Sequence, residues 1–157
     1  LRSRQLAESF KAPDLEEMAE DLIKEGNSVV IFVNFRETVD ALTTKLKCNR
    51  IDGGQSADER QKIIDDFQED KTHVVVANIA AGGTGLSLHD INGNRPRVSL
   101  ICPTFNAKEY VQTLGRIFRN GAKSDSLQKI LIAANSVEEN VMSSINNKLK
   151  NLDALYG

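Results

Sequence analysis

Short apolar runs rich in Val and Ile recur along this chain and constrain its fold more than any other feature. The first, SVVIFVNF at residues 28–35, is dominated by apolar side chains that do not alternate with polar ones. A strand with one face in water would alternate, so this run predicts a strand that is buried on both faces. Further strands are predicted at residues 50–52, 73–77, 98–101 and 127–133.

Helices are predicted between these strands, because the intervening segments carry helix-start signals and apolar residues at helical spacing. The first is expected to begin at Pro13 with Asp14 as its N-cap and to stop at Gly26. Strand–helix alternation of this kind predicts an α/β fold, a mostly parallel sheet with helices on both faces. The other helices are predicted at residues 36–46, after a capping box at 56–59, at 106–118, and after a second capping box at 136–139.

The composition is that of one ordinary globular domain. The 157 residues are 40% hydrophobic and 27% charged, and no apolar run approaches the roughly 20 residues of a membrane span. We expect a linker and N-terminal helix over residues 1–27 and a single domain over 28–157, a fragment of a larger protein because no starting Met is present. Cys48 and Cys102 have no metal-ligand spacing, which predicts a reduced, intracellular protein without a metal site.

The net charge of −2 limits the kinds of partner that the chain can bind. It excludes binders whose affinity for nucleic acid comes from a large basic excess. It is compatible with a protein that holds a phosphate backbone at a few well-placed contacts.

The segment QTLGRIFR at residues 112–119 concentrates side chains that suit phosphate chemistry. Gln112, Arg116 and Arg119 fall on one stripe of the predicted helix, and apolar residues such as Val111 fall on the opposite stripe. We therefore expect the helix to pack its apolar side on the sheet and to present both arginines outward. An arginine placed on a transferring phosphate can accelerate the reaction about 10³–10⁵-fold. The alternative is that the two arginines only complement the helix dipole.

A glycine-rich loop, AAGGTGLSL at residues 80–88, follows a predicted strand. Parallel sheets bind ligands at the carboxyl ends of their strands, and glycines let several backbone N–H groups face one anion. No Lys-Ser or Lys-Thr pair follows the glycines, so the loop is not a Walker A phosphate loop. The alternative is an ordinary strand-to-helix turn.

Five segments in this order resemble the C-terminal lobe of superfamily-two helicases, and most closely the Swi/Snf-type remodelling and translocating ATPases. The resemblance extends from about residue 29 to about residue 149, and five motifs in order with sensible gaps argue against chance agreement. The segments are residues 29–36 (motif four), Asp52-Gly53 with Arg60 and Phe67, residues 80–88 (motif five), residues 103–119 (ending in motif six), and residues 136–139 with Lys148.

This resemblance implies a RecA-like three-layer sandwich that works with a missing N-terminal lobe. That lobe would hold most of the ATP and Mg²⁺. Arg116 and Arg119 would face the γ-phosphate, one of them as an arginine finger. Gln112, Gly85 and Ser87 would line the nucleotide.

The resemblance also implies contacts with a nucleic-acid backbone. These would come from Asn34, Phe35 and Arg36 in motif four, and from Ala80 and Gly82 in motif five. ATP would close the two lobes, and the cycle of closing and opening would step the motor along a strand. The likeness to Swi/Snf-type proteins favours duplex DNA as the track, and we expect the isolated lobe to be an inactive monomer without membrane association.

Some residues depart from the family pattern. Ile79 stands where the family has a hydroxyl residue, Ser87 where it has Asn or Asp, Phe105 where it has Trp, and Phe118 where closer relatives have His. Residues 92–97, NGNRPR, form a longer loop that is either a basic contact point or a solvated turn.

Two other functional classes stay open at the level of sequence. A non-catalytic binding module would keep this lobe only to hold nucleic acid or a protein, but such a module needs no arginine pair aimed at a phosphate. A flavodoxin-like regulator or a small-molecule enzyme is the other class. A regulator of that type needs clustered acidic residues at strand ends, where the sequence offers Asp52 alone.

Overall fold

The computed structural model has a five-stranded sheet at its centre and describes residues 2–80, 86–104, 106–114, 116, 121–133 and 136–156. The strand order is β2-β3-β1-β4-β5, and every pair of neighbours runs parallel. Strand β1 is buried along its whole length and lies between β3 and β4. The predicted parallel α/β sheet is therefore confirmed. The strands are β1 (Ser28–Val33), β2 (Asn49–Ile51), β3 (Val74–Asn78), β4 (Arg97–Ile101) and β5 (Ser126–Ile130).

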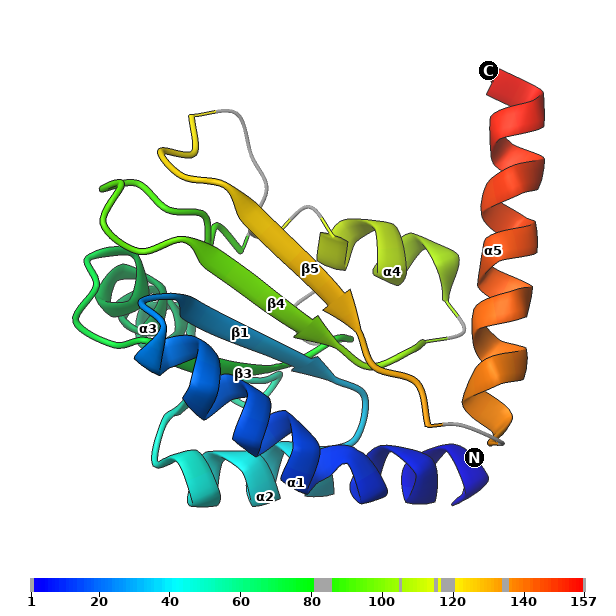
Figure 1. Ribbon diagram of the computed structural model, residues 1–157, viewed down its shortest axis with the longest axis horizontal. Helices are drawn as coiled ribbons and strands as arrows, with labels where there is room; N and C mark the ends of the chain where they lie inside the picture. Colours follow the sequence, from blue (N-terminus) through cyan, green and yellow to red (C-terminus); the bar gives the residue numbers. More distant parts are fainter. Residues whose placement is uncertain are drawn as a thin grey trace.

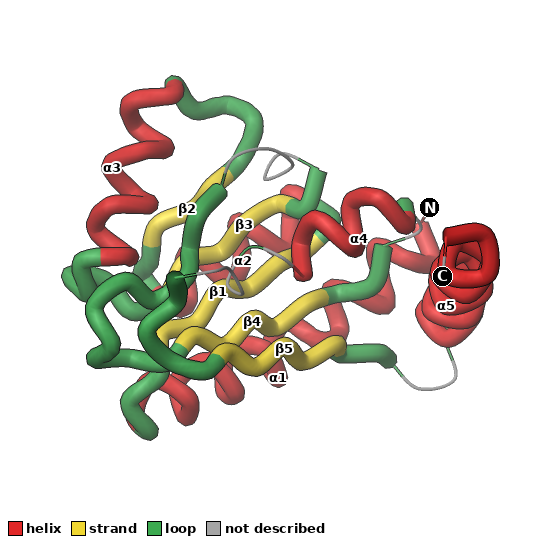
Figure 2. Tube along the Cα trace, turned by 90° about the horizontal axis from the view of Figure 1, so that it is seen from above, coloured by secondary structure: helices red, strands yellow, loops and turns green. Residues whose placement is uncertain are grey.

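Helices cover both faces of this sheet, which gives the molecule three layers. Helices α1 and α2 pack on one face against alternate β1 residues such as Ile31, whereas α3 and residues 86–88 pack on the other face, where Phe32 lies. Figure 1 shows α1 and α2 below the sheet and α4 above it; Figure 2 shows α5 on the side where the strands end. The helices in the described ranges are α1 (Arg2–Lys24), α2 (Arg36–Leu46), α3 (Ala57–Gln68), α4 (Ala107–Leu114) and α5 (Val137–Tyr156).

Helix α1 is longer than the sequence predicts, because it begins at Arg2 and continues through Pro13. The expectation of a helix that starts at Pro13 with Asp14 as its N-cap is therefore wrong, and Asp14 is an exposed residue inside the helix. Proline removes one bond of the helical ladder, because it has no N–H to donate. Burial on both sides of Pro13 offsets that loss: α1 buries Ala7, Glu8 and Lys11 before it and Leu15, Ala19 and Leu22 after it.

The remaining boundaries agree more closely with the sequence pattern. Helix α2 has the predicted bounds, and the capping box at Ser56 and Glu59 is confirmed by hydrogen bonds in both directions. Helix α4 begins after Asn106, whose side-chain oxygen accepts from the N–H groups of Lys108 and Glu109 at 3.0 and 3.2 Å. The described part of α4 ends at Leu114, four residues before the predicted end at residue 118.

A buried arginine organises the connection from β3 to β4. Arg97 is 1% exposed, and its guanidinium lies 4.7 Å from the centre of the Phe67 ring. It donates to the carbonyl oxygens of Leu88 at 3.2 Å, Phe67 at 3.3 Å and Arg95 at 2.8 Å, and to the Asp70 carboxylate at 3.2 Å. Arg97 therefore fixes residues 86–88 to the end of α3.

The two expectations for residues 92–97 are only partly met. Residues 92–94 are exposed, as in a solvated turn. Neither arginine is a surface contact point, however, because Arg97 is buried and Arg95 donates to the carbonyl oxygens of Ile23 at 3.0 Å and Asn27 at 2.7 Å. The longer loop thus serves to join β4 to the end of α1.

A search of the described helices found none that is long and apolar enough to cross a membrane.

We predict that Arg97→Ala lowers the free energy of unfolding by about 3 kcal/mol, because it leaves buried carbonyl groups without donors. Urea denaturation of the variant and the parent chain measures the difference. Lys62→Ala is the control, since the Lys62 side chain on α3 is 77% exposed; we expect it to change stability by less than about 0.5 kcal/mol. Equal stability of the two variants would contradict the role given to Arg97.

Candidate functional site

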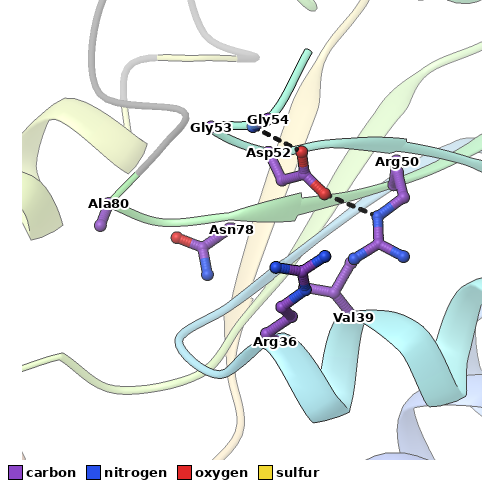
Figure 3. Close-up of a pocket in the computed structure, with 8 residues that line it drawn as sticks. All are labelled: Arg36, Val39, Arg50, Asp52, Gly53, Gly54, Asn78 and Ala80. Atoms are coloured by element: carbon purple, nitrogen blue, oxygen red, sulfur yellow. Dashed lines mark hydrogen bonds and ion pairs between the residues drawn. The ribbon is translucent and has the colours of Figure 1, made fainter.

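The carboxyl ends of β1, β2 and β3 meet at one edge of the sheet and form a cleft. Its volume is about 590 Å³, and it is open to solvent on one side. Figure 3 shows side chains from the start of α2 and from the ends of β2 and β3 around this cleft. The lining residues are Arg36, Val39, Arg50, Asp52, Gly53, Gly54, Asn78 and Ala80.

Asp52 shapes the floor of the cleft. Its carboxylate accepts from the Gly54 N–H at 3.0 Å and from Arg50 Nε at 2.7 Å (Figure 3). The Gly54 N–H, followed by the Arg50 guanidinium and the charge of Arg36, lowers the pKa of Asp52 despite its partial burial. Arg60 donates to the Asp52 carbonyl at 2.9 Å, so the Asp52-Gly53 turn and Arg60, two parts of one predicted motif, are in direct contact.

The arginines of the cleft differ in how much of their charge is already paired. Arg50 forms ion pairs with both Asp40 and Asp52. Arg36 is exposed, has no ion pair with any described residue, and extends over the cleft beside Asn78 in Figure 3. An unpaired guanidinium next to a side-chain amide can bind phosphate oxygens by charge-assisted hydrogen bonds. Arg36 is thus the residue of the cleft with most capacity to bind an anion.

Asn34 and Phe35 lie at the same edge, but their polar groups already have partners inside the protein. The Glu8 carboxylate, on the fully buried Glu8 of α1, accepts from the N–H of Asn34 at 2.9 Å, from the Asn34 side-chain amide at 2.9 Å and from the N–H of Phe35 at 2.9 Å. The Asn34 amide also donates to the Pro103 carbonyl at 2.6 Å, and Asn78 donates to the Asn34 carbonyl at 3.1 Å. Of the three residues predicted to contact nucleic acid in motif four, Arg36 is therefore the one whose side chain has no ion pair with a described residue.

Sequence reasoning missed Glu8, although the sequence holds a signal for it. Glu8, Lys11 and Leu15 lie on one helical stripe that continues through Ala19 and Leu22, and all are buried. Two charged residues inside an apolar stripe at helical spacing indicate a buried polar contact. The signal went unused because the helix was expected to start at Pro13.

The segments that hold Ser87 and Arg116, two of the predicted nucleotide-binding residues, meet at a main-chain hydrogen bond. The N–H of Leu88 donates to the carbonyl of Arg116 at 3.0 Å, so residues 86–88 lie against the end of α4. Ser87 and Gln112 are both half-buried. The structure therefore brings the segments of Ser87 and Arg116 together.

Arg116 does not face outward, contrary to the predicted arginine stripe. This residue follows the described end of α4 and is 6% exposed, whereas Val111, expected on the buried side, is 50% exposed. The prediction that this helix presents Arg116 outward and buries Val111 is therefore wrong. Arg119, Gly85 and Gly82 lie outside the described residues, and Ala80 is exposed at the rim of the cleft.

Neither cysteine has the character of a nucleophile. Both are free, and burial raises the pKa of Cys102 to about 12 and that of Cys48 to about 11. No group of three or more His, Cys, Asp or Glu side chains that could hold a metal ion was found where the structure describes the chain.

Comparison with known proteins places these features in a family context. The family described as "Helicase conserved C-terminal domain" matches residues 11–121. L364 of Acanthamoeba polyphaga mimivirus, which is named as an ATP-dependent RNA helicase, is 43% identical over 155 residues, covering 97% of this chain and 29% of its own length. The SNF2 domain-containing protein ENL1 of Oryza sativa subsp. japonica is 27% identical over 139 residues, covering 85% of this chain and 14% of its own length.

A solved structure agrees with these sequence matches. The C-terminal part of the Fun30 ATPase domain superposes with a TM-score of 0.73 at 25% identity, over 85% of this chain and 44% of that one. The RecA-like fold and the likeness to Swi/Snf-type ATPases are therefore confirmed. The chain spans less than a third of the length of the two relatives described above.

We predict that Asp52→Asn destabilises the protein at neutral pH and that the effect fades in acid. The lowered pKa means that the ionised carboxylate stabilises the fold above the ordinary value of 3.8 and that this contribution is lost as the pH falls through the lower folded-state value. Urea unfolding of both proteins at neutral and acidic pH measures the gap. Asp14→Asn, at an exposed position of α1, is the control and should show no such pH-dependent gap.

Proposed function

Because the chain belongs to the helicase C-terminal domain family, we propose that it is the second RecA-like lobe of an ATP-dependent nucleic-acid translocase of the Swi/Snf type. No Walker A loop occurs in the 157 residues, so an N-terminal lobe of the same protein would hold most of the ATP and its Mg²⁺. This lobe would close onto that nucleotide. On its own the lobe would bind nucleic acid without hydrolysing ATP.

The hydrogen bond between Leu88 and Arg116 is the observation that carries this proposal. It joins the last residue of the glycine-rich loop to the segment that contains the two motif-six arginines. Two sequence motifs that are 28 residues apart at this bond would thereby present one surface to a nucleotide.

In this proposal Arg116 and Arg119 face the γ-phosphate, and Gln112, Gly85 and Ser87 line the nucleotide. A guanidinium can compensate the negative charge of the transferring phosphoryl group, which is the role of an arginine finger. The low exposure of Arg116 favours Arg119 as the finger, with Arg116 holding the loop beside it.

The cleft at the ends of β1, β2 and β3 would hold the nucleic-acid backbone. Arg36 supplies an unpaired charge, and Asn78 and Ala80 complete the wall next to the glycine-rich loop. A single well-placed cation fits a chain with a net charge of −2, whose affinity cannot come from a general positive field. We propose duplex DNA as the track, on the basis of the Swi/Snf likeness.

Hydrolysis of ATP by the full-length protein, with and without duplex DNA, single-stranded DNA and RNA, tests the proposal. We expect one nucleic acid to stimulate hydrolysis and Arg119→Ala to lower the stimulated kcat by about 10³-fold while ATP binding persists. Arg116→Ala is expected to act in the same direction.

Lys62→Ala, which removes an exposed cation from α3, is the control and should leave the stimulated rate unchanged. Hydrolysis that is unaffected by Arg119→Ala would show that the motif-six arginine is not catalytic. A protein that binds nucleic acid without hydrolysing ATP would instead be a binding module.

A further inference from the structure

Helix α2 lacks the side-chain cap that a helix N-terminus ordinarily has. Its N-cap residue is Phe35, which has no side-chain oxygen to accept from the first N–H groups. The carboxylate of Glu8 stands next to this terminus instead, and it accepts from the N–H groups of both Asn34 and Phe35. A negative charge at this position is also stabilised by the positive end of the helix dipole. Glu8 therefore determines how the chain enters α2.

Arg36, the cleft residue with the unpaired guanidinium, is the first residue of α2. Its backbone directly follows the two N–H groups that Glu8 holds, so a shift of the turn at residues 34–35 moves Arg36 with it. No described residue forms an ion pair that would hold the Arg36 guanidinium in place independently. The position of this side chain over the cleft thus depends on a carboxylate from a different helix.

Glu8 is itself held firmly. It is fully buried, and Lys11 on the same stripe of α1 forms a buried ion pair with Glu138 at 2.6 Å and donates to the Leu131 carbonyl at 2.9 Å. Glu138 in turn accepts from the N–H of Ala133 at 2.9 Å. These contacts fix α1 to the start of α5. The Glu8 carboxylate therefore acts on the turn from a rigid support.

We propose that Glu8 is a positioning residue for nucleic-acid binding, which acts by orienting Arg36 at the start of α2. This inference rests on the proposed function, because it requires that the cleft hold a nucleic-acid backbone. Glu8 does not touch the nucleic acid. Its effect reaches the phosphate through the N–H groups of Asn34 and Phe35 and the main chain of Arg36.

The sign of the expected effect separates this role from simple electrostatics. Glu8→Gln removes a negative charge, and a change in net charge alone would strengthen binding to a polyanion. In glutamine, however, an NH₂ group replaces one of the two carboxylate oxygens. This NH₂ group would face an N–H group that now donates to Glu8, and because two donors cannot bond to each other, the turn must shift. If Glu8 orients Arg36, then Glu8→Gln weakens binding to the polyanion, although the variant has one negative charge fewer.

The test is a double-mutant cycle on the dissociation constant of the full-length protein for fluorescein-labelled duplex DNA, measured by anisotropy at several KCl concentrations. We expect Arg36→Ala and Glu8→Gln each to weaken binding about tenfold, and each to reduce the salt slope by about 1, as loss of one phosphate contact does. Arg36→Ala in the Glu8→Gln background should weaken binding by less than about twofold further.

Glu138→Gln is the matched control, because it removes a buried carboxylate from the α1–α5 contact, does not touch residues 34–36, and leaves the bond from Lys11 to the Leu131 carbonyl to hold α1 in place. It should lower stability to urea as Glu8→Gln does and leave the salt slope unchanged. Variants are compared only at temperatures where circular dichroism shows each to be folded.

The outcomes distinguish the two proposals. If Arg36→Ala weakens binding but Glu8→Gln does not, or if their effects multiply, Glu8 has no positioning role and the proposed cleft stands. If Glu138→Gln reduces the salt slope as much as Glu8→Gln, the effect is one of general stability and the positioning role is rejected. If Arg36→Ala leaves binding unchanged, the cleft does not hold the backbone and both proposals fail.

Discussion

The buried guanidinium of Arg97 is the contact on which the second face of the sheet depends. In the described part of the chain no helix connects β3 to β4, and residues 86–88 pack on this face together with α3. Main chain in a core needs partners for its polar groups. Arg97 supplies them, since it donates to carbonyls of Leu88 and Phe67 while its charge is met by Asp70. The N–H of the same residue, Leu88, donates to the carbonyl of Arg116.

Both candidate regions are therefore positioned through main-chain groups rather than through the side chains that define the motifs. Arg97 acts on Leu88 and hence on Arg116, and Glu8 acts on the turn that precedes Arg36. Each organising side chain is buried, charged and distant in sequence from the residue that it places. A motif of exposed polar residues would be poorly ordered without such support, because surface side chains have considerable conformational freedom.

The sequence predicts what local patterns determine and fails where distant contacts decide. The strands and most helix starts follow from apolar runs and capping residues such as Ser56, which act over a few positions. The continuation of α1 through Pro13 goes with burial of residues on both sides of it, including Lys11, whose partner Glu138 lies far away in the sequence. For the same reason the arginines of residues 92–97 suggested a surface contact, although Arg95 and Arg97 are internal anchors. Burial of Arg116 was missed because helical spacing alone put it on one outward stripe with Gln112.

The distribution of charge follows from this arrangement and bears on how the lobe can bind a polyanion. Several of its charged groups, among them Glu8, Lys11, Arg97 and Glu138, are buried in internal networks and add little to the field outside the protein. Arg50 is compensated by two carboxylates at the cleft itself. Among the described residues that line the cleft, Arg36 is the cation without an ion pair, so binding there would depend on its placement rather than on attraction from a distance. Weak long-range attraction would suit the proposed translocase lobe, which would have to release its track and bind it again at every step.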